Sequence, residues 1–195
     1  MYDRRVTAPD RLCFTGDDDA DRLLAESPLA LLIGFALDQQ VPVPTAFAGP
    51  LKLQQRLGSL DAAELAGLEP EKLQAAFREK PAVHRFPGAM ATRIQELART
   101  VVSEYAGDAS RVWIEAADAD DLRRRIGALP GFGPMKITAL GSVLAKRYGL
   151  PQAQGLVPDF PTLGDVDSPE ALAAYQEKKR AYKASLRARS PRVSP

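Results

Sequence analysis

The chain has 195 residues, of which 45% are hydrophobic and 26% are charged, and its formal net charge is +1. These values are those of a globular protein that can bury a core, and no run approaches the roughly 18 apolar residues of a membrane span. The N-terminal residues, Met-Tyr-Asp-Arg-Arg, lack the apolar stretch of a signal peptide. We therefore expect a cytoplasmic protein with no membrane partner.

The sequence contains a single cysteine, Cys13, and a single histidine, His84. One cysteine excludes an internal disulfide and a four-cysteine zinc or iron–sulfur site, and one histidine excludes the usual histidine-based metal clusters. We therefore expect no metal and no cofactor. Any catalysis must rest on carboxylates, lysines or hydroxyls.

Three regions follow one another along the chain. Residues 1–26 form an N-terminal extension, with a short extended segment at 11–16. Residues 27–150 read as a helical core, and 151–195 as an aspartate-bearing loop followed by a basic helix that packs on that core. The sequence therefore predicts an all-α fold.

The core opens with a helix that is apolar nearly all round. Ser27 is a cap, Pro28 is a first-turn proline, and the apolar run continues to Leu37. A helix without a polar face is typical of the buried centre of a fold. The polar residues Gln39 and Gln40 follow it in a turn.

Further helices are predicted from apolar residues at helical spacing. Leu51 faces inward in the first and Phe77 in the third. The last and longest carries Met90, Ile94, Leu97, Val101 and Tyr105 along one face. Residues 108–113 then serve as a link, and the predicted helices span about 45–57, 61–66, 70–79 and 88–105.

Two helices flank a glycine-rich turn at 129–136. Leu122, Ile126 and Leu129 lie on one face of the first helix, which Pro130 ends. Pro134 is well placed as the first residue of the second helix, whose buried stripe is Ile137, Leu140 and Leu144. The pattern predicts helix, tight hairpin, helix.

The hairpin itself has the features of an anion site. Gly131 and Gly133 lack Cβ, so the chain can adopt positive φ and a phosphate can approach the N–H groups at the helix N-terminus. Phe132 lies between them, and Lys136 adds a positive charge. The alternative is a glycine-containing turn in an ordinary helical pair.

The C-terminal helix begins at Ser168-Pro169 and is strongly basic. A basic tail suits a polyanion partner, although a solvated terminal helix has the same composition. The basic residues are Lys178, Lys179, Arg180, Lys183, Arg187, Arg189 and Arg192.

The order of these parts resembles the helix-hairpin-helix (HhH-GPD) superfamily of base-excision DNA glycosylases, and within it the compact bacterial repair proteins of that type. The resemblance covers residues from about 27 to 150, and its most specific part is Leu-Pro-Gly-Phe-Gly at 129–133. The other matching stretches are the apolar helix with its Asp-Gln-Gln-Val-Pro turn at 38–42, and His-Arg-Phe-Pro-Gly-Ala-Met at 84–90.

The resemblance implies a helical DNA-glycosylase-like fold that binds double-stranded DNA, flips out a base and cleaves its N-glycosidic bond. Gln40 is at the position of the family's stack-filling residue, with Gln39 beside it. Both are also explained by a polar turn that ends a helix. The residues implied in phosphate binding are Gly131, Phe132, Gly133 and Lys136, with Arg85 and Arg93 as further candidates.

The resemblance places a catalytic aspartate in the loop after the hairpin helices. Asp167 matches best, Asp165 is its close rival, and Asp159 lies in the same loop. Helix capping and turn formation explain any of these aspartates equally well. Glycosylases that form a Schiff base carry lysine where this chain has Met135, which implies a monofunctional enzyme.

Two other functions remain open. The chain can be a non-catalytic DNA-binding or damage-recognition module that retains the hairpin, or a helical scaffold whose hairpin contacts protein. The first two functions predict salt-dependent DNA binding, since each phosphate contact releases counterions. We expect the protein to act as a monomer.

Overall fold

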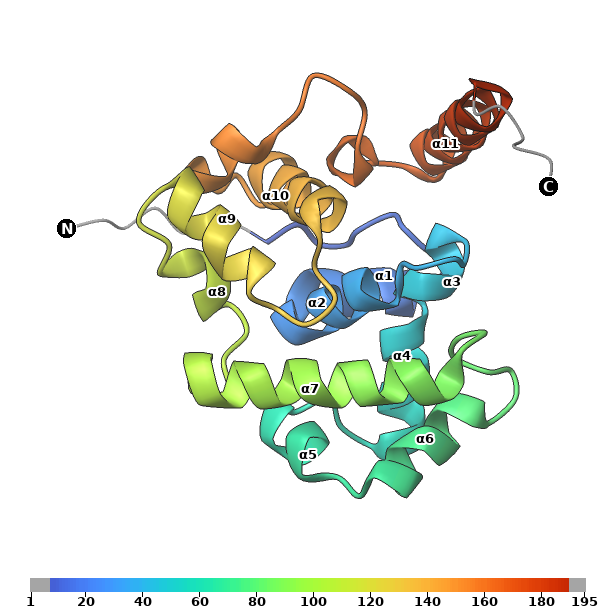
Figure 1. The fold of residues 1–195 in the computed structure, drawn as a ribbon, viewed down its shortest axis with the longest axis vertical. Coiled ribbons are helices and arrows are strands. Elements are labelled where there is room, and N and C mark those ends of the chain that lie inside the picture. The colour runs from blue at the N-terminus through green and yellow to red at the C-terminus, as the bar shows by residue number, and fades with distance from the viewer. Residues whose placement is uncertain (1–7, 190–195) are drawn as a thin grey trace, which may run out of the picture.

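The computed structural model describes residues 8–189, and residues 1–7 and 190–195, with Arg192 of the basic tail, lie outside the described part. Within that part all the regular secondary structure is helical, as predicted, and there is no strand (Figure 1). The helices are α1 (Asp18–Glu26), α2 (Pro28–Leu37), α3 (Val43–Phe47), α4 (Gly49–Leu57), α5 (Ala62–Gly67), α6 (Pro70–Arg78), α7 (Pro87–Tyr105), α8 (Arg111–Ile114), α9 (Ala119–Gly127), α10 (Pro134–Arg147) and α11 (Pro169–Arg189), with 3₁₀ turns η1 (Pro151–Leu156) and η2 (Leu163–Asp165).

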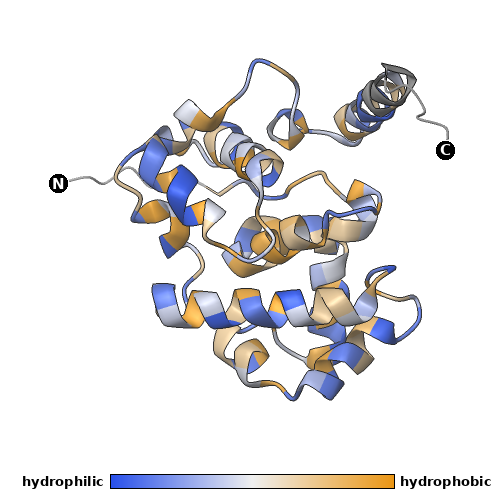
Figure 2. Ribbon diagram, viewed as in Figure 1, coloured by the Kyte–Doolittle hydropathy of each residue, from blue (hydrophilic) through white to orange (hydrophobic). Residues whose placement is uncertain are grey.

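Helix α2 is the buried centre, and this prediction is confirmed. Every residue of α2 after Pro28 is buried, and the helix is among the most hydrophobic segments in Figure 2. Ser27 caps it by accepting a hydrogen bond from the N–H of Ala30 at 3.1 Å. The C-terminal end of α2 lies beside the first turn of α10, where Lys136 donates a hydrogen bond to the carbonyl oxygen of Ala36. The residues that follow α2 therefore lie close to the hairpin.

Helix α7 lies between α2 and the pair formed by α5 and α6 (Figure 1). Its predicted stripe is confirmed, since Met90, Ile94, Leu97, Val101 and Tyr105 are all buried. The helix ends where Ala106 and Gly107 both adopt positive φ. The rigid α7 therefore presents its N-terminal half to the residues that follow α2.

The helix predicted at 45–57 is two helices. Pro50 has no N–H to donate, so the chain breaks at Ala48 between α3 and α4. Leu53 is fully buried in place of the predicted Leu51, which is only half-buried. The predicted link at 108–113 also contains a short helix, α8, which buries Val112 and Trp113.

The segment assigned to an N-terminal extension contributes to the core. Leu12 and Phe14 are fully buried, and the ring of Phe14 packs edge-on against Phe47 with centroids 5.1 Å apart. Asp21 holds this segment by accepting hydrogen bonds from the N–H groups of Phe14 and Thr15. The sequence predicts an extended stretch at 11–16, and the structure has bends and no regular element before α1.

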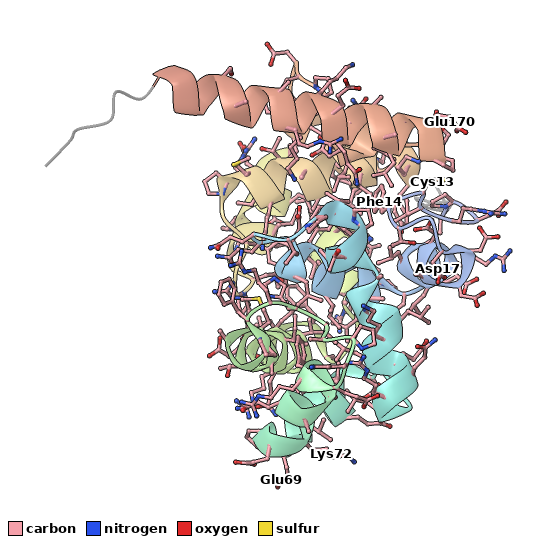
Figure 3. All side chains as sticks on the ribbon, turned by 90° about the vertical axis from the view of Figure 1, so that its right-hand side faces the viewer. Cys13, Phe14, Asp17, Glu69, Lys72 and Glu170 are labelled. Carbon is pink, nitrogen blue, oxygen red and sulfur yellow. The ribbon has the colours of Figure 1, made fainter. Side chains whose placement is uncertain are left out.

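Helix α10 is wrapped by the loop that follows it. Both η1 and η2 pack against α10, and α11 then crosses over it at the end of the molecule opposite α6 (Figures 1 and 3). Cys13 lies near the start of α11 in Figure 3, and its thiol donates to the carbonyl oxygen of Asp167 at 3.4 Å. None of the helices between residues 8 and 189 is both long and apolar enough to cross a membrane.

Candidate nucleic-acid interface

Residues 129–136, here called the hairpin, join α9 to α10 and include the first turn of α10. Gly131 has φ +83°, and the N–H of Phe132 donates to the carbonyl oxygen of Leu129 at 3.2 Å. A Cβ at Gly131 would lie 2.7 Å from Cδ of Arg93 on α7. The left-handed backbone therefore favours glycine at this position, and a larger residue would also displace the side chain of Arg93.

Gly133 differs from Gly131 in both respects. Its φ of −88° suits any residue, and a Cβ added there would meet no atom within 4 Å. Its carbonyl oxygen accepts hydrogen bonds from the N–H groups of Lys136 and Ile137 and so begins α10. Nothing in the described fold requires glycine at 133.

The first turn of α10 presents unpaired backbone donors. Among residues 8–189, no acceptor is within hydrogen-bonding reach of the N–H groups of Gly131, Gly133 or Met135. All three residues line an open cavity of about 620 Å³, which we call the first cavity. Free N–H groups at the N-terminus of a 14-residue helix are suited to an anion.

The first cavity is bounded on its other side by Arg93 and Gln39. Nη1 of Arg93 donates to Oε1 of Gln39 at 2.5 Å, while the stem of Arg93 lies against Gly131. The arginine therefore joins α7, the hairpin and the residues after α2. The cavity brings together the predicted residues Gln39, Gly131, Phe132, Gly133 and Lys136.

Residues 38–40, here called the glutamine turn, leave α2 in a tight bend. The N–H of Gln39 donates to the carbonyl oxygen of Leu37 at 2.7 Å, and Gln40 has φ +58°. The side chain of Gln39 is held by Arg93, whereas Gln40 is exposed and, within the described chain, its side chain has no hydrogen-bond partner. Gln40 does not line the first cavity.

Lys136, which the sequence predicts to add a positive charge beside the anion site, points toward the C-terminus of α2. Its Nζ donates to the carbonyl oxygen of Ala36 at 3.0 Å and lies 5.9 Å from the ring centroid of Phe132. Burial lowers the pKa of Lys136 to about 8, opposed by Asp38 and assisted by Arg93. The position of residue 136 on α10 explains the direction of its side chain. A side chain at 136 faces the C-terminus of α2, whereas a side chain at 135 faces solvent, as the 83% exposure of Met135 shows.

We predict that replacing Lys136 by methionine changes how stability depends on pH. The folded pKa of about 8 lies below the ordinary 10.5, so between these values the unfolded chain binds more protons. The free energy of unfolding of the wild type therefore gains a rising contribution with pH across that window. Urea titrations at several pH values should show this contribution, and K136M should lack it. An identical pH dependence in K136M would contradict the placement of the ammonium group.

A second, smaller cavity of about 230 Å³ shares Pro134 and Met135 with the first. It is more apolar, and its remaining residues are Thr138, Ala139, Phe160, Pro161, Thr162 and Tyr175. Phe160 is 60% exposed at its edge. Burial, with smaller contributions from Asp38 and Asp165, raises the pKa of Tyr175 to about 12, so its phenol is a neutral hydrogen-bond donor.

The predicted catalytic aspartates line neither cavity. Asp165 caps η2 by accepting from the N–H of Thr162 at 2.8 Å, and its other oxygen lies 2.5 Å from Nζ of Lys146. Burial raises the pKa of Asp165, but the hydrogen bonds from Lys146 and Thr162 outweigh it and lower the pKa below the ordinary value. All three loop aspartates, Asp159, Asp165 and Asp167, are exposed.

The two aspartates should be separable by stability. D165N removes the charge that binds Lys146 and weakens the cap, so we expect a loss of about 1 kcal/mol in the free energy of unfolding. D167N should change it by less than about 0.5 kcal/mol because the carboxylate is exposed. Denaturant titrations of both variants measure the difference. A D165N variant as stable as the wild type would contradict this structural role of Asp165.

One residue of this interface could not be assigned from the sequence. His84 is buried, and its Nε2 lies 2.9 Å from the carbonyl oxygen of Gln39, 45 residues away in the chain. A lone histidine before Arg85 and Phe86 carries no signal for such a contact. Among the described residues, no cluster of three histidine, cysteine, aspartate or glutamate side chains could hold a metal ion.

Comparison with protein families and with curated protein sequences identifies no relative of this chain. No protein-family model matches the chain, and no curated protein sequence matches it significantly.

Proposed function

We propose that this protein is a helix-hairpin-helix DNA glycosylase-like protein that binds duplex DNA through the hairpin and the glutamine turn. The observation that carries the proposal is the set of unpaired N–H groups of Gly131, Gly133 and Met135, residues that line a cavity together with a cation, Arg93. Unpaired donors at a helix N-terminus bind a phosphate without a side chain's help.

The glycine at 133 supports a ligand of this kind. Neither its backbone conformation nor its surroundings exclude a larger residue. A missing Cβ does allow a phosphate oxygen to approach the backbone closely. Glycine is therefore explained at 131 by the fold and at 133 by the proposed ligand.

The pair of adjacent cavities supports an extruded nucleotide as the ligand. The first cavity supplies backbone donors and a guanidinium group, and the second supplies an apolar slot with Phe160 and Tyr175. Because Pro134 and Met135 form a wall common to both, a phosphate in the first leaves its base close to the second. Aromatic and apolar side chains are what a flipped base stacks against.

Base release would proceed by hydrolysis. Water adds to C1′ of the deoxyribose as the bond to the base nitrogen breaks, and the base leaves with the bonding electron pair. A carboxylate accepts the proton of the water and later releases it to solvent, while the base takes up a proton from solvent. Asp167 is our candidate for the carboxylate because the charge of Asp165 is engaged by Lys146. Met135 at the position of a Schiff-base lysine supports a monofunctional reaction.

A non-catalytic DNA-binding module is the second candidate. The observation in its favour is that Asp165 and Asp167 line neither cavity. This candidate shares every phosphate contact with the first and differs only in the cleavage step. A binding measurement cannot distinguish them, so chemistry must be assayed.

The test is incubation with duplexes that carry uracil, an alkylated base or an oxidised base, followed by denaturing electrophoresis with and without alkali. A monofunctional glycosylase gives strand breaks only after alkali, and D167N should abolish them while it still binds DNA. No cleavage of any lesion, together with salt-dependent binding, would favour the non-catalytic module. Binding that is independent of salt would exclude both.

A further inference from the structure

Helix α11 has two parts of opposite charge. The first part, residues 169–177, carries Glu170 and Glu177 and no lysine or arginine. The second part, residues 178–189, is here called the basic segment and contains no acidic residue. Its charged residues are Lys178, Lys179, Arg180, Lys183, Arg187 and Arg189. The charge therefore changes sign once along the helix, between residues 177 and 178.

The first part of α11 packs on the core. Leu172 is buried, and Tyr175 lines the second cavity together with Met135 in the first turn of α10. Further along, Nζ of Lys179 lies 3.7 Å from Oδ2 of Asp38 and 5.7 Å from the ring centroid of Tyr175. Asp38 is the first residue of the glutamine turn, so α11 reaches the proposed DNA-binding site where the basic segment begins.

Helices α10 and α11 run in opposite directions. The turn η2, which precedes α11, packs on the C-terminal half of α10, where Lys146 binds Asp165. Tyr175 of α11 instead lies beside Met135 at the N-terminus of α10. Figure 3 shows α11 crossing the molecule from Glu170 and reaching past the other helices at its C-terminal end.

The basic segment therefore extends past the N-terminus of α10. Ten residues of α11 follow Lys179, and at about 1.5 Å per residue they add about 15 Å. The free N–H groups of a helix point out of its N-terminal end, and those of the hairpin lie at this end of α10. A phosphate bound there lies on the side of the molecule into which the basic segment projects.

The hairpin and the glutamine turn offer few positive charges that are free of other contacts. The guanidinium group of Arg93 binds Gln39, and Lys136 is turned toward the C-terminus of α2. Affinity for duplex DNA comes largely from cations that neutralise phosphates. In the basic segment, Lys178 and Arg180 are exposed, and neither has an ion-pair partner within residues 8–189.

The composition of the basic segment suits a nucleic acid better than a membrane. A helix that lies in a membrane surface needs a broad apolar face as well as positive charge. Residues 178–189 contain only Tyr182 and Leu186 as large apolar residues. Phosphates of a duplex need the positive charge alone.

We propose that the basic segment of α11 is a second DNA-binding surface, whose lysines and arginines contact phosphates of the duplex beside the nucleotide held at the hairpin. The inference rests on the proposed function, because the hairpin sets where the duplex lies. It adds a contact that is independent of the lesion, since phosphates carry no sequence information.

Two double variants test this surface. K178Q/R180Q removes two exposed charges from the basic segment and leaves the contact of Lys179 intact. The matched control, K72Q/R99Q, removes two exposed charges at the other end of the molecule, on α6 and on the side of α7 that faces α5. The two variants have the same net charge, so a difference between them reports the position of the charges.

The experiment measures affinity by fluorescence anisotropy over a range of salt concentrations, for an undamaged duplex and for one with an abasic-site analogue. We expect K178Q/R180Q to bind both duplexes about tenfold more weakly at low salt, with a slope of log affinity against log salt that is shallower by about 2. The control K72Q/R99Q should match the wild type. Identical salt titrations of the two variants would overturn the proposal.

A third variant, G133A, separates this proposal from the proposed function because its Cβ crowds the phosphate site of the hairpin. If only G133A weakens binding, the hairpin binds DNA and the basic segment does not. If only K178Q/R180Q weakens binding, the hairpin function fails and the basic segment remains a DNA-binding surface. Absence of any duplex binding rejects both.

Vesicles of phosphatidylcholine and phosphatidylserine test the membrane as the partner. We expect no flotation of the wild type with these vesicles in a density gradient. Flotation that K178Q/R180Q loses, with unchanged duplex affinity, would assign the basic segment to a membrane and overturn the proposal.

Discussion

Replacing Gly131 by alanine should lower the free energy of unfolding by about 1 to 3 kcal/mol and weaken duplex binding. The backbone at 131 has φ +83°, where an L-residue is strained, and the new Cβ would lie 2.7 Å from Cδ of Arg93. Displacing Arg93 also breaks its hydrogen bond to Gln39. The substitution therefore disturbs the hairpin and the glutamine turn together. Denaturant unfolding and duplex anisotropy measure the two effects.

Gly133 provides the matched comparison two residues away. Alanine at 133 meets no atom within 4 Å and keeps an ordinary φ of −88°, so G133A should change stability by less than about 0.5 kcal/mol. Its Cβ would nevertheless crowd a phosphate at the free N–H groups. We expect the slope of log affinity against log salt to become shallower by about 1, the amount that corresponds to one lost phosphate contact. If G133A has the affinity and the salt dependence of the wild type, the hairpin is not part of the DNA-binding surface.

Replacing Gly164 by alanine is expected to cause the second large loss, about 1 to 3 kcal/mol in the free energy of unfolding. Gly164 packs on α10, where an added Cβ would lie 2.5 Å from the backbone carbonyl oxygen of Ser142. A backbone atom in a helix cannot move aside as a flexible side chain can. The substitution must therefore push η2 away from α10, along with Thr162 at the edge of the second cavity.

Gly67 is the control for this prediction. It ends α5, has no positive φ, and an added Cβ would meet no atom within 4 Å. G67A should leave the protein as stable as the wild type or more stable by up to about 1 kcal/mol. Thermal unfolding of both variants under the same conditions makes the comparison. Equal stability of G164A and G67A would mean that η2 is not packed on α10 as described.

The sequence predicts the helices well where apolar residues recur at helical spacing over several turns. The stripe of α7 and the apolar run of α2 both lie where expected. In each case many apolar side chains must be buried together, and a helix with that face in the core is the arrangement that buries them. The break at Ala48 and the short α8 are missed because a single proline or a single turn carries too little periodicity.

The site is only partly predictable for a different reason. The glycines at 131 and 133 and the glutamine turn are local in sequence, and the chain does bring Gln39 and the hairpin to one cavity. The direction of Lys136 and the contact of His84 with Gln39 depend on how α10 and the α6–α7 loop meet the end of α2. Such contacts between distant segments leave no pattern in the sequence of either segment.

The placement of Arg93 makes the interface a connected unit. Its stem packs on Gly131, its guanidinium group binds Gln39, and its charge bears on both His84 and Lys136. Changes at the hairpin therefore reach the glutamine turn through one side chain. This coupling explains why G131A is expected to affect more than the hairpin, whereas G133A is not.

The most direct measurement of the central proposal is the perturbation of backbone amide resonances when a duplex containing an abasic-site analogue is added to ¹⁵N-labelled protein. The amides of Gly131, Gly133 and Met135 have no partner within residues 8–189 and should show the largest shifts, together with that of Gln40. Large shifts confined to other surfaces, with these four amides unchanged, would contradict the proposal that the hairpin and glutamine turn bind DNA.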